Sequence, residues 1–449
     1  MIEIEFKNYQ NKPYKHIDNR ISIDTVKKYI TTPEKIARHS FLPFLHYNKI
    51  FSKYVGYENA SDNERPIKEK IRSLMYAGHL DSFIYKYYSD LLNYFYNLWM
   101  IDNKLNEFSV AYRTNKKHQS SINFAAEAIS FLSKMDKAFI IVGDFEKFFD
   151  TLDHRLLKVR LQRVLNTEQL SNDWYNVYKS LTKFAYIEKE TLENTDHPLV
   201  LKKSSSYFNS IKDFRKYKKK NKCKLNRESY GIPQGNALSG VLANVYAMDF
   251  DKEMGRIAGQ YEGFYRRYSD DFILILDIDL LQEDYGNLFV DKIQNIVYEL
   301  ANQNKITLQK EKNEVRLYEK RVVTDISSNQ THLDYLGFVF DGENVKLREK
   351  SIYKFYREAR HLISKSKVVQ KRKSLSKLPN RHKIYSLYTD FGCSKYYPSN
   401  FITYAKRSQD IFDKLSPQTN NMMLEQLKNR KKKIEKALGY RIHSRMENK

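Results

Sequence analysis

A short apolar run, residues 138–143 (Ala-Phe-Ile-Ile-Val-Gly), ends directly on Asp144. Its length and its β-branched and aromatic residues predict a buried strand. Two further strand-like runs, residues 264–268 and 272–276, flank Ser269-Asp270-Asp271, and this pattern predicts a hairpin with two carboxylates at its tip. An acidic side chain at the end of a buried strand is costly to desolvate unless it has a partner.

Three carboxylates at neighbouring strand ends therefore predict a shared site for divalent cations. Two ions ~3.5–4 Å apart can activate an attacking hydroxyl and stabilise the leaving oxygen of an in-line phosphoryl transfer. Mg²⁺ suits this chemistry because it takes few protein carboxylates and completes its shell with phosphate and water, and Mn²⁺ is a second candidate. A structural alternative stays open, in which Asp144 caps the following helix and Asp270 and Asp271 only make a turn.

The rest of the chain mixes helix-like and strand-like segments, which predicts an α+β fold. The predicted helices are residues 21–95 (mainly helical), 154–165, 236–254 and 286–304, and the further predicted strands are residues 315–318 and 335–340. Residues 190–228 are polar, rich in Ser and Lys, and aperiodic, so they predict an inserted loop. From about residue 350 onward the pattern is basic and helical.

Positive charge is concentrated in three stretches of the chain. The sequence has 78 Lys and Arg against 54 Asp and Glu, a formal net charge of +24. Residues 202–224 hold ten bases and one acid, residues 360–383 hold nine bases and no acid, and residues 428–445 hold eight bases and one acid. Clustered positive charge is typical of a protein that binds a polyanion, most simply nucleic acid. The alternative is that these stretches are only solvated surface helices and loops.

Cysteine content and the residues at the chain start argue against several classes of protein. Cys223 and Cys393 are too few and too far apart for a disulfide scaffold or a cysteine zinc site, and they fit a reducing cytosol. No run of about 18 apolar residues occurs, so the sequence predicts no membrane span. The start, Met1-Ile-Glu-Ile-Glu-Phe, lacks the basic start and apolar stretch of a signal peptide, so we expect a cytoplasmic protein.

Five short motifs follow one another across residues 138–340. They are Ile141–His154 (IVGDFEKFFDTLDH), Gly231–Ser239 (GIPQGNALS), Tyr268–Asp271 (YSDD), Leu308–Asn313 (LQKEKN) and Leu336–Phe338 (LGF). Together they resemble the motifs of reverse transcriptases, in that family's order. A lone Asp-Asp pair would be a weak signal, but five motifs in register are specific. Two positions depart from the family: Asn313 stands where Thr is usual, and Ser269 stands where Ala, Met or Val is commoner.

The resemblance implies a role for each matching position. Asp144 and Asp270 would be the principal metal ligands, with Asp271 in support. Phe149 would lie under the sugar of the incoming nucleotide and exclude a 2′-hydroxyl by steric clash, which favours deoxynucleotides. Gln234 lies in a turn shaped by Pro and Gly that would hold this nucleotide against the template.

Other matching positions would contact the nucleotide and its phosphates. Gly235 would let the backbone approach the nucleotide. Lys312 is a candidate proton donor to the leaving pyrophosphate, although a solvated lysine is the alternative. Arg113 resembles the fingers position that contacts the triphosphate, and Lys116 and Lys117 compete with it for this role.

Shorter matches lie upstream, at His16–Ser22, His39–Pro43 and Arg72–Tyr85. They resemble the N-terminal segments of the bacterial "unknown group" reverse transcriptases, which are defence-associated and related to the abortive-infection polymerases. This resemblance implies an antiphage role in the bacterial cytoplasm, with a partner non-coding RNA as template, dNTPs as substrates and DNA as product. The primer is left unassigned, and a homo-oligomer is left open.

The same resemblance implies a right-hand polymerase. We expect a helical N-terminal segment and fingers over residues 1–135, a ferredoxin-like antiparallel palm over residues 136–345 with an insertion at 190–228, and a basic helical thumb over residues 346–449. About 110 residues follow the last motif. That length leaves room for a thumb but not for a ribonuclease H domain.

Three alternatives stay open beside an RNA-templated DNA polymerase. One is a retron-type enzyme that makes an RNA–DNA hybrid product. Another is an RNA-dependent RNA polymerase, although Phe149 argues against it because such enzymes place a polar group there. The third is a catalytically silent RNA-binding protein, against which the intact set of Asp144, Gln234, Asp270 and Asp271 argues.

Overall fold

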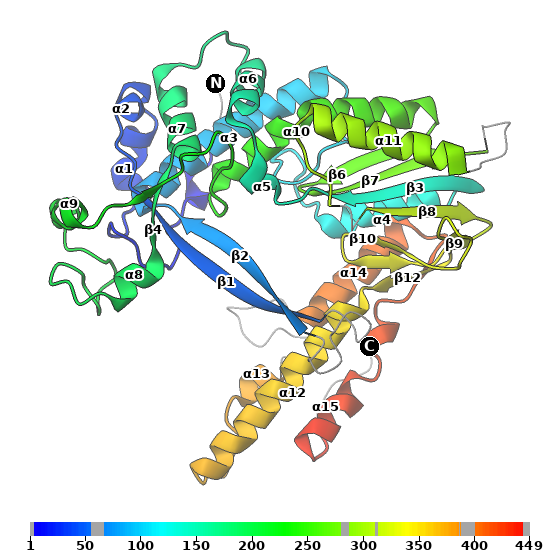
Figure 1. Ribbon diagram of the computed structural model, residues 1–449. Coiled ribbons are helices and arrows are strands. Elements are labelled where there is room, and N and C mark those ends of the chain that lie inside the picture. Colours follow the sequence, from blue (N-terminus) through cyan, green and yellow to red (C-terminus); the bar gives the residue numbers. More distant parts are fainter. Residues whose placement is uncertain are drawn as a thin grey trace.

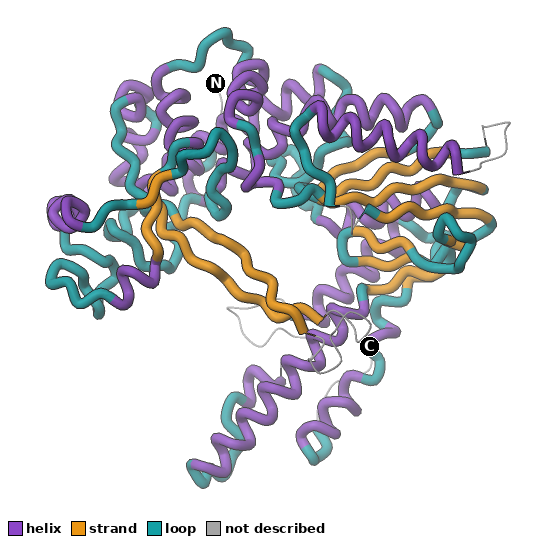
Figure 2. The backbone as a smooth tube through the Cα atoms, viewed as in Figure 1, coloured by secondary structure: helices purple, strands orange, loops and turns teal. Residues whose placement is uncertain are grey.

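The computed structural model describes residues 4–54, 67–279, 287–309, 313–385, 387 and 400–442. Its described helices and strands form a mixed helix-and-sheet protein with three small sheets. Figure 2 shows the strands as separate groups with helices between and around them. Among the described residues, none of the helices combines the length and apolar character needed to cross a bilayer.

The central sheet carries the acidic motifs. Its strands are β3 (Lys137–Asp144), β6 (Phe264–Tyr268), β7 (Asp271–Asp277), β8 (Glu314–Glu319) and β9 (Val322–Thr324). They are antiparallel and lie in the order β6-β7-β3-β8-β9. The central sheet and the helices α10 (Ala237–Gln260) and α11 (Asn287–Gln303) follow the order β3-α10-β6-β7-α11-β8, a β-α-β-β-α-β pattern. Residues 148–225, with further helices and the strands of another sheet, are inserted between β3 and α10. The predicted strands and helices in this region are confirmed.

Both faces of the central sheet are buried, which explains why its strands are continuously apolar rather than alternating. Phe139, Ile141 and Leu274 join the core that contains residues of α10 and α11. Ile140 and Ile273 point to the other face and join the core that contains α4 (Ser121–Leu132). In Figure 1, α10 and α11 lie along one side of this sheet.

A second sheet joins the C-terminal region to this centre. Its strands are β10 (Leu333–Tyr335), β11 (Phe338–Phe340), β12 (Asn344–Leu347) and β13 (Asn420–Asn421). The prediction of one strand over residues 335–340 is wrong. Leu336 and Gly337 adopt φ values of +48° and +94° and form the turn between β10 and β11.

The C-terminal region is helical, as predicted from about residue 350. Its elements are α12 (Glu349–Arg372), α13 (Arg381–Tyr385), α14 (Phe401–Leu415), the 3₁₀-helix η4 (Glu425–Leu427) and α15 (Arg430–Leu438). α14 packs on α4, and β13 pairs in parallel with β12. The C-terminal region therefore shares a core with the central unit.

The prediction that residues 21–95 are mainly helical is wrong in the middle of that range. Helices α1 (Ile23–Ile30), α2 (Pro33–Ala37) and α3 (His79–Asp102) are present, but β1 (Phe44–Tyr54) and β2 (Ile67–Tyr76) form a long antiparallel hairpin between α2 and α3. The 3₁₀-helix η1 (Phe6–Asn8) precedes this range. Much of this hairpin is exposed, for example at Ile50 and Ile71. Because the hairpin buries little apolar surface, apolar and polar residues alternate only weakly along its two strands.

The prediction that residues 190–228 form an aperiodic loop is also wrong. This stretch contains α8 (Lys189–Asn194), α9 (Ile211–Lys220) and β5 (Lys224–Leu225), and β5 pairs with β4 (Ala185–Glu188). Only Phe214 and Tyr217 of α9 are buried. Two buried positions among many lysines give too short a periodic pattern to predict a helix from the sequence. The remaining helices are α5 (Phe148–Thr151), α6 (His154–Val164) and α7 (Asn172–Thr182), and α6 confirms the prediction for residues 154–165.

Candidate active site

The strand register brings the predicted carboxylates together. Asp144, the last residue of β3, is the direct cross-strand partner of Asp271, the first residue of β7. Directly opposed residues of an antiparallel pair project from the same face of the sheet. Asp270 lies one residue earlier, in the turn between β6 and β7, and its carbonyl accepts a hydrogen bond from the backbone N–H of Phe145 at 3.0 Å.

The chemistry of this donor set fits Mg²⁺, which prefers carboxylate oxygens. Within the described part of the chain, however, no three acidic, histidine or cysteine side chains are grouped closely enough to hold a metal ion. Joint binding of an ion by Asp144, Asp270 and Asp271 would therefore need side-chain rotation. Their backbones already lie next to one another, so no rearrangement of the strands is required.

A buried ion pair lies beneath the turn that carries Asp270. Arg267 on β6 and Asp251 on α10 are both 0% exposed, and two Arg267 nitrogens donate to the Asp251 carboxylate at 2.7 and 2.6 Å. Burial alone would lower the pKa of Arg267, but the facing Asp251 carboxylate raises that pKa above its ordinary value. Another nitrogen of Arg267 donates to the Ser269 carbonyl at 2.7 Å, so this pair fixes the turn directly. The five motifs include neither residue as a site residue, although an acid and a base inside otherwise apolar segments are a signal of a buried ion pair.

Tyr112 also contacts this turn, through the side chain of Ser269. Its hydroxyl shares a 3.0 Å hydrogen bond with the Ser269 hydroxyl. Its ring packs directly on α10, because a Cβ added at Gly240 would lie 2.8 Å from it. Tyr112 and Ser269 have φ values of +60° and +63°, a left-handed conformation that costs roughly 1–3 kcal/mol per residue. The hydroxyl of Ser269, where the resembled family commonly has an apolar residue, thus has a structural partner.

The Pro/Gly turn at residues 231–235 forms backbone hydrogen bonds with two other segments, one that contains Phe149 and one that contains Met75. The N–H of Ile232 donates to the Phe149 carbonyl at 2.9 Å, and the N–H of Met75 on β2 donates to the Gln234 carbonyl at 2.9 Å. Gly235 has a φ of +115°, and a Cβ there would lie 2.9 Å from the Met75 carbonyl oxygen. Glycine is therefore required at this position by both its conformation and its close contact.

Phe149 lies in α5, close to the end of β3 in the sequence. Its ring is half-buried and packs against the main core, with its centroid 6.0 Å from that of Phe148. The hydrogen bond from the N–H of Ile232 joins the backbone of Phe149 to the Pro/Gly turn that contains Gln234. Exclusion of a 2′-hydroxyl by this ring stays a prediction.

Arg113 lies inside the protein. Its guanidinium donates to the Asn97 side chain at 2.8 Å, to the carbonyl and side chain of Asn106 at 2.7 Å each, and to the Ser109 carbonyl at 3.0 Å. The predicted contact with a triphosphate would require these bonds to open. Its competitor Lys116 forms an ion pair with Glu107, and Lys312 lies outside the described residues.

The hairpin of β1 and β2 carries positive charge outside the three basic stretches. Lys49 and Arg72 are cross-strand partners, and both approach the ring of Phe51, at 4.9 and 5.5 Å from its centroid. Burial raises the pKa of the Tyr112 phenol, Asp270 raises it further, and Arg72 acts in the opposite direction.

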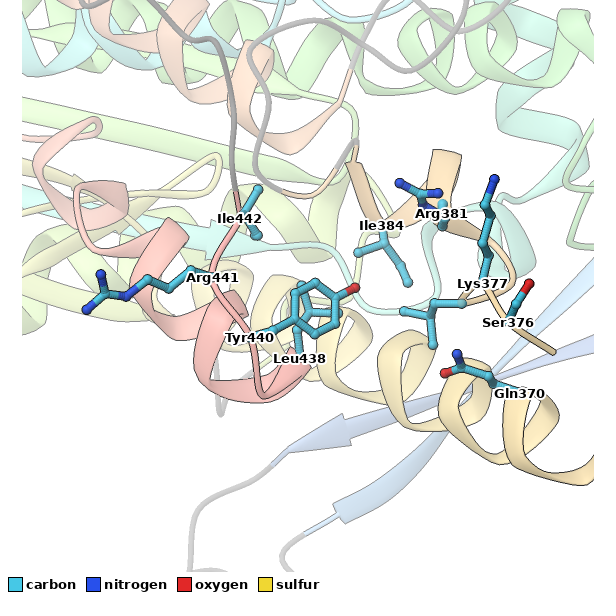
Figure 3. Close-up of a pocket in the computed structure, with 10 residues that line it drawn as sticks. Gln370, Ser376, Lys377, Arg381, Ile384, Leu438, Tyr440, Arg441 and Ile442 are labelled. Carbon is cyan, nitrogen blue, oxygen red and sulfur yellow. The ribbon is translucent and has the colours of Figure 1, made fainter. Parts of the chain in front are cut away.

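The C-terminal region contains a separate pocket of about 500 Å³ between α12, α13 and the residues after α15. Figure 3 shows residues that line it, among them the bases Lys377, Arg381 and Arg441 and the apolar Ile384 and Leu438. None of its lining residues belongs to the five motifs, so this pocket is separate from the carboxylates.

No protein-family model and no curated protein matches this chain. Among solved structures, it is similar to an apo telomerase from Candida tropicalis truncated from its C-terminal domain, with 13% identity, a TM-score of 0.41, and coverage of 61% of this chain and 52% of that one. It is also similar to a telomerase from Candida albicans in complex with a TWJ fragment of telomeric RNA, with 14% identity, a TM-score of 0.38, and coverage of 95% and 72%. The chain spans about half the length of the first structure. At this level of similarity, its chemistry has to be derived from its own residues.

Replacement of Asp251 by alanine is expected to lower the free energy of unfolding by about 3–5 kcal/mol, because it leaves Arg267 buried with an uncompensated charge. Urea denaturation measures this loss. The matched control is Glu253→Ala on the same helix, which breaks an exposed pair with Arg256 and should cost less than about 1 kcal/mol. The double variant Asp251→Leu/Arg267→Met should recover most of the loss. Equal costs for Asp251→Ala and Glu253→Ala would contradict a stabilising role for the buried pair.

Proposed function

We propose that this protein is an RNA-templated DNA polymerase, a reverse transcriptase that uses two-metal nucleotidyl transfer. The observation that carries the proposal is the register of β3 and β7, which sets Asp144 opposite Asp271 with Asp270 in the adjoining turn. The bonds from the Pro/Gly turn to Phe149 and to Met75 support it, because they bring the predicted nucleotide-binding segments to one neighbourhood.

We further propose a right-hand architecture for the chain. The β-α-β-β-α-β unit would be a ferredoxin-like palm, and the hairpin of β1 and β2 with the N-terminal helices would be the fingers. The basic helices from α12 onward would be the thumb. The support for this assignment is the strand order of the central sheet together with the position of the acidic motifs on it.

Asp144, Asp270 and Asp271 would hold the two Mg²⁺ ions, with Mn²⁺ as a substitute. When bound, such ions activate the primer hydroxyl and stabilise the leaving pyrophosphate. The protein's own contribution is position: Arg267 and Tyr112 hold the turn that carries Asp270. Catalysis by positioned groups depends on small geometric tolerances, so a rigid turn is what this chemistry requires.

Phe149 and Gln234 would contact the sugar and base of the incoming dNTP. Because the guanidinium of Arg113 is bonded to protein acceptors, we propose Arg72 and Lys49 as the residues that attract the triphosphate. Both are exposed on the hairpin whose base is bonded to Gln234. Lys312 stays a proposed proton donor on the strength of its motif.

The template would be RNA, the product DNA, and the role antiphage defence with a partner non-coding RNA. The support for the defence role and for the partner RNA is the resemblance of the N-terminal segments. The clustered bases support a nucleic-acid partner on electrostatic grounds.

The variant Asp270→Asn/Asp271→Asn is expected to abolish dNTP incorporation, because it removes two of the three carboxylates. The test supplies Mg²⁺ and labelled dNTPs or NTPs to the protein with its co-purified nucleic acid, and the products are sequenced. Asp277→Asn, at the far end of β7, is the matched control and should retain incorporation. Incorporation by the double variant would refute the two-metal proposal, and incorporation of NTPs alone would favour an RNA polymerase.

Phe149→Ala should relax sugar discrimination, because it removes the ring that excludes the 2′-hydroxyl. A steric overlap costs about 1–3 kcal/mol, so the ratio of kcat/KM for NTPs to that for dNTPs should rise by about 5- to 150-fold. Single-nucleotide incorporation measures this ratio. Phe148→Ala, at the buried neighbour, is the control and should leave the ratio unchanged even where it reduces stability. An unchanged ratio in Phe149→Ala would exclude the steric role.

Tyr112→Phe and Ser269→Ala each remove one half of the same hydrogen bond. A hydrogen bond contributes about 0.5–1.5 kcal/mol, so each variant should lower kcat by about 2- to 13-fold with little change in KM for dNTP. The double variant should be no slower than the single ones, since the two hydroxyls act as a pair. Independent, multiplying effects would show that the two residues do not position the turn together.

A further inference from the structure

Residues 189–225 form a small unit, which we call the α9 unit, and it shares a separate hydrophobic core with β1, β4 and the N-terminal segment. Phe214 and Tyr217 of α9 belong to this core. Its other buried members are Ile17, Leu45, Ile187, Leu192, Val200, Tyr207 and Phe208. In Figure 1 α9 lies at the left edge of the molecule, on the side opposite the central sheet.

The α9 unit is firmly attached to the strands beside it. The N–H of Tyr207 donates to the His16 carbonyl at 2.8 Å. β5 pairs with β4, and β4 pairs in parallel with β1. Inside the unit, the ring of Phe208 packs on those of Phe214 and Tyr217, with centroids 5.3 Å apart in both cases. The outer face of α9 is therefore held in a fixed orientation.

That outer face carries almost only positive charge. Its exposed bases are Lys212, Arg215, Lys216, Lys218, Lys219 and Lys220. Asp213 is the single acid of the helix and lies 3.9 Å from Lys216. Across the residues that the structure describes, none of the other five bases has an ion-pair partner.

This arrangement works against the stability of the helix. Arg215 has like charges three and four residues ahead of it, at Lys218 and Lys219, and like charges at these spacings destabilise a helix. The three lysines of the last turn gain some compensation from the helix dipole. A helix of ten residues is marginal by itself, so packing of Phe214 and Tyr217 has to hold the bases together against their repulsion.

The chemistry of the face favours a polyphosphate over a protein or a membrane. Along α9 itself there is no exposed aromatic or large apolar side chain to act as an anchor for a protein partner, and the exposed Leu225 of the unit lies on β5. A membrane-surface helix would insert its apolar face into lipid, but here that face is buried in the core of the α9 unit. Closely spaced lysines without a partner match the regular phosphates of a nucleic acid.

We propose that the α9 unit binds the phosphate backbone of an RNA chain, independently of base sequence and away from the carboxylates. The inference rests on the proposed function only for the identity of that chain as RNA. The unit would hold RNA that is not at that moment being copied, since α9 and the central sheet lie on opposite sides in Figure 1.

The test compares RNA binding by the wild-type protein and the variant Lys218→Gln/Lys219→Gln/Lys220→Gln, which keeps helix-forming residues. Fluorescence anisotropy with labelled single-stranded RNA of mixed sequence is measured over a range of salt concentrations. Each lost phosphate contact should reduce the slope of log K against log[salt] by about 0.7, so the variant should lose about 2 from the slope. An unchanged slope would overturn the proposal.

The charge-matched control is Lys134→Gln/Lys252→Gln/Lys292→Gln, which removes three exposed bases after α4 and on α10 and α11. Its slope should stay close to that of the wild-type protein. An equal loss in the control would show a general effect of net charge and overturn a specific role for α9. Tighter binding of wild-type protein to phosphatidylserine vesicles than to RNA would overturn it as well.

Primer extension separates this inference from the proposed function. With saturating pre-annealed RNA template and DNA primer, the α9 variant should extend with wild-type kcat. The wild-type protein could incorporate no dNTP while the α9 variant shows a reduced salt slope for RNA binding. That result would refute the polymerase proposal and support the RNA-binding surface on α9. If extension occurs and the slope is unchanged, only the α9 proposal fails.

Discussion

The antiparallel register between β3 and β7 is the constraint on which the candidate site depends. Side chains of a strand alternate between faces, so a slip of one residue would exchange every side chain between the two cores. Phe139 and Ile141 would then face α4, and Ile140 would face α10 and α11. Because both faces of the sheet are packed, either core resists the slip. The same register sets Asp144 opposite Asp271, so hydrophobic packing positions the carboxylates.

A second constraint acts on the turn next to that register. Arg267 and Asp251 are completely buried, and each needs the other because an unpaired charge in such a place is costly. Their bond ties β6 to α10, and Arg267 also holds the carbonyl of Ser269. Tyr112 adds a hydroxyl bond to the same residue. Together these hydrogen bonds can keep a turn with a strained backbone in one conformation. Hydrogen bonds are directional, so they specify that conformation more sharply than packing alone does.

The sequence predicted the central elements well because each is a long apolar segment with a clear period, such as residues 138–143 and 236–254. It failed where little apolar surface is buried. The hairpin of β1 and β2 is largely exposed, and α9 has two buried residues among lysines. The predicted triphosphate contact of Arg113 stays a prediction, because its guanidinium donates hydrogen bonds to Asn97 and Asn106 in this structure. A short motif match gives a residue type and no information on which way the side chain faces.

The sequence by itself determined the types of residue available: the three aspartates at the ends of apolar runs, the Pro/Gly turn, and the stretches of positive charge. Only the tertiary structure decided which of them meet. Cross-strand pairing joins Asp144 to Asp271 across more than a hundred residues of chain, and backbone bonds join Met75 to Gln234. Local periodicity reports burial along one element, whereas such contacts depend on the register and packing of several elements at once, and no single segment encodes that information.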